Sequence, residues 1–183
     1  MELTPPDQPL WVFGYGSLIW DPGFAFADRR RARLVGWRRS FCMHSIHYRG
    51  TPEAPGLVLA LDADPSGSCE GVAYGVDAAQ AGAVTDYLRA RELISYAYVE
   101  ARLPVILDDG RSVPALTYVI NRDHSQYAGH LPPEDQARII AERSGERGPN
   151  ADYLYATAAH LHDLGVPDPD LDWLAARVRA LRE

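Results

Sequence analysis

The chain has 183 residues and a formal net charge of −7 at pH 7, a length that predicts one domain, residues 1–183, with a sizeable core. The acidic balance argues against a nucleic-acid-binding protein. All 18 basic residues are arginine, so the chain has no lysine for Schiff-base chemistry or for a P-loop.

The cysteines and the hydropathy pattern indicate the compartment. Cys42 and Cys69 fit neither a CxxC zinc motif nor a disulfide framework, which is typical of a reducing compartment. Met1–Pro9 is polar and acidic, without the apolar segment of a signal peptide, and no apolar stretch reaches membrane-spanning length. The sequence therefore predicts a cytoplasmic protein that binds neither a membrane nor nucleic acid.

The first two thirds of the chain have mainly the pattern of β-strands. Short apolar runs and alternating apolar residues recur, and only Ala78–Arg91 changes to helical spacing, with Val84 and Leu88 near one face. The expected strands are Leu10–Phe13, Trp37–Ser45, Gly56–Leu61, Gly71–Val76, Ala101–Leu107 and Val113–Ile120.

From Leu131 onward the pattern becomes helical. Pro133 suits the first turn of a helix, and Asn150 suits the N-cap of a helix Ala151–Leu164 that Gly165 ends. Because many strands precede these helices, the predicted fold class is α+β, a small mixed β-sheet or barrel with packed helices. A final amphipathic helix has its apolar face at Leu171, Leu174, Val178 and Leu181.

A glycine-rich segment follows the first expected strand. Gly14 and Gly16 permit a positive φ and a close backbone approach, so that consecutive N–H groups can converge on an anion or a polarised carbonyl. A plain turn without a ligand is the alternative interpretation. The segment consists of Val12, Phe13, Gly14, Tyr15, Gly16, Ser17 and Leu18.

Glu92 is the carboxylate that stands out, at the expected end of the inserted helix. Its charge opposes the helix dipole there, and with partial burial this predicts a pKa raised toward neutrality, as a general base near pH 7 needs. The alternative is an exposed glutamate paired with Arg89 or Arg91. The apolar neighbours expected around it are Leu88, Leu93 and Tyr96.

Other polar residues are weaker candidates. His44 and His47 have no carboxylate at ligand spacing, so we expect structural or surface roles and no metal site. Ser17 lacks the G-x-S-x-G context of a nucleophile. Arg49, in a glycine-flanked segment, is a candidate for gripping a substrate carboxylate, and Tyr118 is a candidate pocket wall.

Five segments together resemble the ChaC-type γ-glutamylcyclotransferases, in order and near their spacing, over almost the whole chain. They are VFGYGSLIW (Val12–Trp20), HYRGTPEAPG (His47–Gly56), EGVAYGV (Glu70–Val76), YLRARE (Tyr87–Glu92) and PNADYL (Pro149–Leu154).

The resemblance implies a compact sheet or barrel with packed helices, no cofactor, and cleavage of glutathione to 5-oxoproline and Cys-Gly. It assigns substrate binding to the segment Val12–Leu18 and the general acid/base role to Glu92. Family members often have Gly-Gly-Tyr after this glutamate. Here Ile94-Ser95-Tyr96-Ala97-Tyr98 follows, which leaves open whether Tyr96 or Tyr98 faces the site.

Two other functions remain as alternatives. One is a cyclotransferase for another γ-glutamyl compound, a γ-glutamyl-amine or a γ-glutamyl amino acid. The other is a non-catalytic module that binds γ-glutamyl groups. Glu92 argues against the second, because a pure binder of an amino acid needs no proton-shuttling acid.

Overall fold

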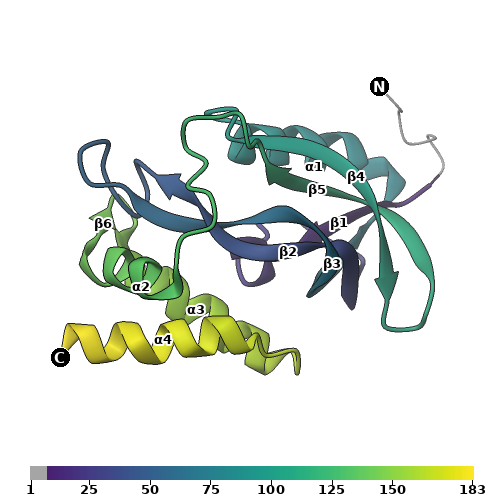
Figure 1. Ribbon diagram of the computed structural model, residues 1–183. Coiled ribbons are helices and arrows are strands. Elements are labelled where there is room, and N and C mark those ends of the chain that lie inside the picture. The colour runs from purple at the N-terminus through teal and green to yellow at the C-terminus, as the bar shows by residue number, and fades with distance from the viewer. Residues whose placement is uncertain (1–7) are drawn as a thin grey trace. The chain divides into compact units, whose positions relative to one another are not determined.

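The computed structural model describes residues 8–183 (Figure 1). Residues 1–7, which carry most of the polar N-terminal segment discussed above, lie outside the described residues. The chain forms two compact units, so that the expectation of one domain stays a prediction. Within the described residues, the first unit contains 8–38 and 61–121, and the second contains 39–60 and 122–183.

A closed barrel with the strand order β1-β3-β2-β4-β5 is the main feature of the first unit. β1 pairs antiparallel with the end of β3 and parallel with β5, and β5 also pairs with β3 at Leu61. β4 and β5 form a hairpin whose turn contains Gly110 at φ +89°, a conformation that glycine adopts readily. The strand bounds are β1 Leu10–Gly14, β2 Asp28–Ser45, β3 Gly56–Val76, β4 Tyr98–Leu107 and β5 Ser112–Ile120.

Two helical segments belong to this unit. The short 3₁₀ helix η1, Ser17–Ile19, follows β1, and α1, Ala78–Glu92, follows β3. Val84 and Leu88 are the buried residues of α1, as the helical spacing predicts. The fully buried large side chains of the first unit include Leu10, Phe13, Leu34, Leu61, Tyr74, Leu88, Leu116 and Tyr118.

The second unit is mainly helical. Its three helices pack against one another in Figure 1, with Ile140, Leu154 and Val178 among the buried residues. The helices are α2 Pro133–Glu142, α3 Asn150–Asp163 and α4 Pro169–Arg182, and the small hairpin between α2 and α3 consists of β6 Ser144–Gly145 and β7 Gly148–Pro149. In the described part of the chain, no helix is both long and apolar enough to cross a membrane.

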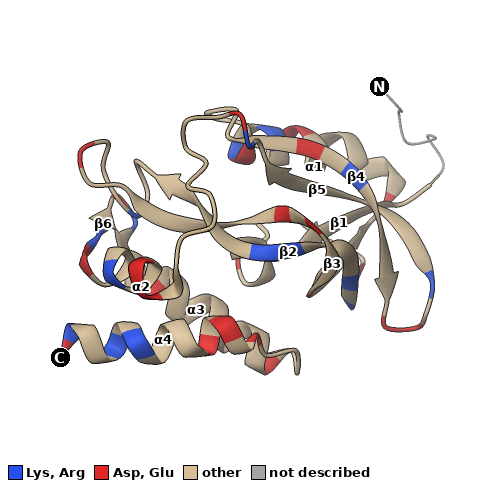
Figure 2. Cartoon of the chain, viewed as in Figure 1, with Lys and Arg blue, Asp and Glu red and all other residues tan. Residues whose placement is uncertain are grey.

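Charges follow the dipole of α4 (Figure 2). Asp168 caps the helix, because its carboxylate accepts hydrogen bonds from the N–H groups of Asp170 and Leu171. Asp170 and Asp172 lie in the first turn, and Arg179 and Arg182 lie in the last turn. Acidic residues at the N-terminus and basic residues at the C-terminus both stabilise a helix.

The α+β class with a barrel and packed helices is confirmed, but two strands are longer than the sequence pattern predicts. β2 begins at Asp28, and β3 runs without interruption through Asp64-Pro65-Ser66-Gly67, where turn-forming residues separate the two expected strands. Asp64 does accept a local hydrogen bond from the N–H of Ser66. Pairing with neighbouring strands of the barrel overrides the local preference here.

The helix ends agree with the sequence at two positions and differ at a third. Pro133 begins α2, and Gly165 follows α3 with φ +75°. The expected N-cap at Asn150 is wrong, because the helix already begins at this residue and its side chain makes no cap. Its amide instead accepts a hydrogen bond from the N–H of Leu57 and donates one to the carbonyl of Leu57, both at 2.8 Å.

Replacing this residue tests the stability of the second unit. Asn150 is 0% exposed, so Asn150→Ala leaves both backbone groups of Leu57 buried without their partner. We expect the free energy of unfolding to fall by about 2–5 kcal/mol, measured by chemical denaturation. The control Gln80→Ala, on the exposed face of α1, is expected to change it by less than about 0.5 kcal/mol. Equal stabilities of the two variants would contradict the assigned role of Asn150.

Candidate active site

The glycine segment folds back on itself by close approach of its backbone rather than through unusual dihedral angles. A Cβ atom on Gly14 would lie 2.9 Å from the Cβ of Leu18, so only glycine lets the chain fold back this tightly after β1. Neither glycine adopts the positive φ that its residue type permits. Gly14 pairs with Val72 as part of β1, and Gly16 has a φ of −137°.

η1 presents backbone N–H groups at its beginning. Its first hydrogen bond runs from the N–H of Ile19 to the carbonyl of Gly16, at 2.9 Å. The N–H groups of Ser17 and Leu18 therefore have no partner within the helix. At the other end, the hydroxyl of the buried Tyr74 donates to the carbonyl of Leu18 at 2.7 Å, which fixes η1 to the barrel wall.

Arg91, at the end of α1, connects the helix to this segment. Its Nη2 donates to the Ser17 hydroxyl at 3.0 Å, and its Nη1 donates to the carbonyl of Asp21 at 2.6 Å. Its Nε lies 3.4 Å from a carboxylate oxygen of Glu92. One guanidinium thus contacts both the glycine segment and the candidate acid.

Glu92 is the last residue of α1, which confirms its predicted position at the helix end. Its side chain is 16% exposed and forms the ion pair with Arg91 that the alternative interpretation described. Tyr96 is 74% exposed and has a φ of +57°, and its expected contact with Glu92 stays a prediction. The raised pKa of Glu92 stays a prediction, as does the choice between Tyr96 and Tyr98 as the residue that faces the site.

Tyr118, on β5, is buried at 2% exposure and belongs to a polar network. Its hydroxyl donates to Oε1 of Glu100 at 3.1 Å, and Arg89 forms an ion pair with the same carboxylate at 2.9 Å. Burial, together with the charges of Glu100 and Glu92, raises the pKa of Tyr118 above its usual value.

Tyr15 connects the two parts of the candidate site. Its hydroxyl donates to the backbone carbonyl of Tyr118 at 2.7 Å, and Thr117 donates to the carbonyl of Phe13 at 3.1 Å. The parallel pairing of β1 with β5 explains these contacts, because Val12 pairs with Leu116 in the same register. The structure therefore brings the glycine segment, Tyr118 and Glu92 together in the first unit.

Arg49 lies in the second unit and binds backbone. Its Nη1 donates to the carbonyls of Arg147 and Pro149, at 3.0 and 3.1 Å, and its guanidinium lies over the ring of Tyr153, 5.8 Å from the centroid. These contacts hold the β6–β7 hairpin to the loop between β2 and β3 that carries Arg49. A role of Arg49 in substrate binding stays a prediction.

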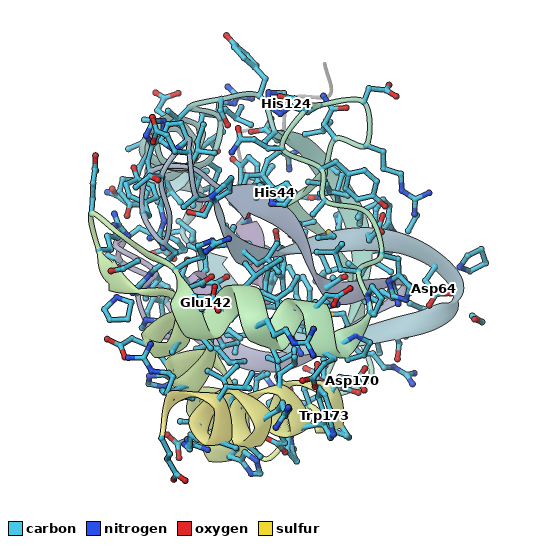
Figure 3. The ribbon with its side chains drawn as sticks, turned by 60° about the vertical axis from the view of Figure 1, so that its left-hand side comes forward. His44, Asp64, His124, Glu142, Asp170 and Trp173 are labelled. Carbon is cyan, nitrogen blue, oxygen red and sulfur yellow. The ribbon has the colours of Figure 1, made fainter. Side chains whose placement is uncertain are left out.

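His44 and His47 both belong to the second unit. His44 lies on β2 and is labelled in Figure 3, and the N–H of Glu146 donates to the backbone carbonyl of His47 at 2.9 Å. Among residues 8–183, no group of three His, Cys, Asp or Glu side chains is placed to hold a metal ion. Cys42 and Cys69 are both buried thiols.

Sequence reasoning missed the residues that hold the site in place. Tyr74 and Glu100 carry no local signal, because a tyrosine or a charged residue on a strand has many roles. The sequence suggests Arg91 only as an ion-pair partner of Glu92, because its contact with Ser17 joins residues that are 74 positions apart. Only the alternation along β4 could have pointed to Glu100, because it places Glu100 on the same face as Arg102. In the sheet Glu100 is the pairing partner of Tyr118.

Comparison with known proteins decides the family. The model of the family described as ChaC-like protein matches residues 10–181. The chain belongs to the ChaC-like family. This membership confirms the resemblance drawn from the five sequence segments.

The relatives of this ChaC-like chain are similar along almost all of its length. It is 36% identical over 181 residues to the glutathione-specific γ-glutamylcyclotransferase of Escherichia coli (strain K12), covering 99% of this chain and 78% of that protein. It is 35% identical over 176 residues to the human glutathione-specific γ-glutamylcyclotransferase 1, covering 95% and 79%. A crystal structure of the yeast γ-glutamyl cyclotransferase specific to glutathione superposes with a TM-score of 0.86 at 25% identity, covering 96% and 98%.

Adding one methyl group tests the close approach in the glycine segment. In Gly14→Ala the new Cβ must displace Leu18, and we expect the free energy of unfolding to fall by about 1–3 kcal/mol. The control Gly82→Ala adds the same methyl on α1 with nothing within 4 Å, and it is expected to stabilise the protein by about 0.5–1 kcal/mol. Thermal unfolding of both variants measures the difference, and a Gly14→Ala variant as stable as the parent would refute the packing argument.

Proposed function

We propose that this chain is a γ-glutamylcyclotransferase that cleaves glutathione to 5-oxoproline and Cys-Gly. The observation that carries the proposal is the contact of the Arg91 guanidinium with both Ser17 of the glycine segment and the carboxylate of Glu92. A group that binds an amino acid and a group that moves protons are thus held side by side. The curated relatives in bacteria and humans are named as glutathione-specific enzymes of this kind.

The reaction needs no nucleophile from the protein. The α-amino group of the substrate attacks its own δ-carbonyl carbon, a five-membered lactam closes, and the bond from this carbon to the cysteine nitrogen breaks. An intramolecular attack in a well-oriented substrate gains an effective concentration of roughly 10⁵–10⁸ M. The enzyme therefore has to fold the γ-glutamyl arm and transfer protons.

Glu92 performs both proton transfers. Its carboxylate takes a proton from the α-ammonium group, because only the free amine attacks, and the resulting carboxylic acid returns a proton to the leaving nitrogen. The Arg91 guanidinium, whose Nε lies 3.4 Å from a carboxylate oxygen of Glu92, holds this side chain beside the glycine segment. The attacking nitrogen loses a second proton as the lactam closes, and this proton leaves with the amine of Cys-Gly, which is released as an ammonium group. The cycle therefore takes up and releases no net proton.

The glycine segment binds the substrate. The N–H groups at the beginning of η1 and the Ser17 hydroxyl are hydrogen-bond donors that suit the α-carboxylate or the oxygen of the tetrahedral intermediate. Because Arg91 donates to the oxygen of Ser17, the hydroxyl proton of Ser17 is directed elsewhere and can be offered to the substrate. Tyr118 forms a wall of this site.

The remaining parts of the proposal follow from the same chemistry. The reaction changes no oxidation state and adds no water, so it requires neither a cofactor nor a metal ion. We place the protein in the cytoplasm, where its two buried thiols, Cys42 and Cys69, stay reduced. Its partner is a small-molecule substrate, with no nucleic acid or membrane involved.

A first experiment tests the role of Glu92. Glu92→Gln keeps the shape of the side chain but removes the base, so we expect kcat to fall by about 10²–10⁴ while the unfolding temperature stays close to that of the parent. The control Glu142→Gln changes an exposed glutamate on α2, shown in Figure 3, and is expected to leave kcat unchanged. Near-normal turnover of glutathione by Glu92→Gln would remove Glu92 from the mechanism.

A second experiment tests the attack by the substrate amine. N-acetyl-glutathione lacks the nucleophile, and the α-glutamyl isomer would have to close a strained three-membered ring, so we expect neither compound to be turned over. Glutathione is expected to give 5-oxoproline, measured by chromatography. Free glutamate as the initial product would indicate a hydrolase, and faster turnover of other γ-glutamyl amino acids or amines would assign a different substrate to the same mechanism.

A further inference from the structure

The Glu100 carboxylate lies at the centre of a hydrogen-bond network that has no role in the proton transfers proposed above. Glu100 on β4 is paired directly with Tyr118 on β5, and its Oε1 accepts the hydrogen bond from the Tyr118 hydroxyl at 3.1 Å. Arg89 of α1 donates to both carboxylate oxygens, from Nε and Nη2, at 2.9 Å each. All three residues belong to the first unit.

The direction of every hydrogen bond in this network is fixed. The Arg89 guanidinium only donates, and a carboxylate only accepts. The Arg89 guanidinium, with the Tyr118 hydrogen bond as a smaller contribution, holds the pKa of Glu100 below its usual value, so this carboxyl is ionised near neutral pH. Burial and the nearby carboxylates raise the pKa of Tyr118, which keeps its proton.

The single proton of Tyr118 is therefore committed to Glu100. A phenol oxygen that donates its only proton in one direction can only accept hydrogen bonds in the others. In the described part of the chain, no group donates to the Tyr118 oxygen. Tyr15 of the glycine segment donates to the backbone carbonyl of Tyr118 at 2.7 Å, so Tyr118 lies beside this segment.

We propose that Glu100 is a positioning residue that orients the Tyr118 hydroxyl so that its oxygen accepts a hydrogen bond from the α-ammonium group of the substrate. This inference rests on the proposed function. An ammonium group has three donors and no acceptor, so it needs acceptors around it. Glu92 removes one proton, and Tyr118 holds a second N–H, which turns the nitrogen lone pair toward the carbonyl carbon.

Arg89 explains how a second carboxylate can lie so close without hindering the reaction. An uncompensated Glu100 charge would stabilise the ammonium form, whereas the attack requires the neutral amine. The bidentate ion pair with Arg89 neutralises the charge of Glu100. Glu100 therefore does not pair with the ammonium group of the substrate. The network thus presents a neutral acceptor rather than another anion.

A double-mutant cycle separates this role from a merely structural one. We expect Glu100→Gln to lower kcat/KM for glutathione by about tenfold to hundredfold, because its amide can donate to the Tyr118 oxygen and turn the hydroxyl around. In the Tyr118→Phe background the same change is expected to cost less than about twofold, since no hydroxyl is left to orient. An equal loss in both backgrounds would overturn the proposal.

A substrate analogue without the ammonium group gives a second, independent measurement. In glutaryl-Cys-Gly a hydrogen replaces the α-amino group, so its inhibition constant is expected to stay within about twofold in Glu100→Gln and in Tyr118→Phe. The dissociation constant of glutathione, measured in the Glu92→Gln background to prevent turnover, is expected to rise by about tenfold or more with either change. Equal weakening of both ligands would overturn the inference, and Tyr118→Phe provides the test even where Glu100→Gln does not fold.

The outcomes distinguish this inference from the proposed function. A parent protein that forms no 5-oxoproline from glutathione refutes the function and the inference with it. A parent protein that is active, together with a Glu100→Gln variant whose kcat/KM and ligand selectivity match those of the parent, refutes the inference alone. Glu142→Gln serves again as the matched exposed control.

Discussion

The candidate site depends on the contacts that the guanidinium of Arg91 makes with three partners. Its nitrogen atoms lie against Ser17, the carbonyl of Asp21 and the carboxylate of Glu92, so one planar cation joins the chain after β1 to the end of α1. A flexible point charge would not hold three partners in fixed directions at once. The shape of the Arg91 side chain therefore sets the distance between the glycine segment and the Glu92 carboxylate.

The features that the sequence predicts correctly are those with a local signal. Glu92 falls at the end of a helix because the helical spacing of Val84 and Leu88 is followed by a loss of periodicity. Gly165 ends α3 because a residue with positive φ is needed there. The family is also predicted correctly, because the resemblance depends on the order of five segments and not on any one of them.

The features that it does not predict are set by distant contacts. Asn150 is of a residue type that often caps helices. Its side-chain amide instead pairs with the backbone of Leu57, 93 positions away. The turn-forming residues of β3 stay in a strand because neighbouring strands of the barrel hold them. Gly14 is required because the backbone passes close to Leu18. From the sequence, a glycine needed for such a close approach looks the same as a glycine needed for a turn.

The absence of lysine gives the two arginines of the site a further significance. Arg89 pairs with Glu100 and Arg91 pairs with Glu92, and a guanidinium in a protein is always protonated. Neither can donate a proton to the reaction or lose one to the solvent. In the proposed mechanism the protons move between Glu92 and the substrate, while the charges of the two arginines beside them stay constant.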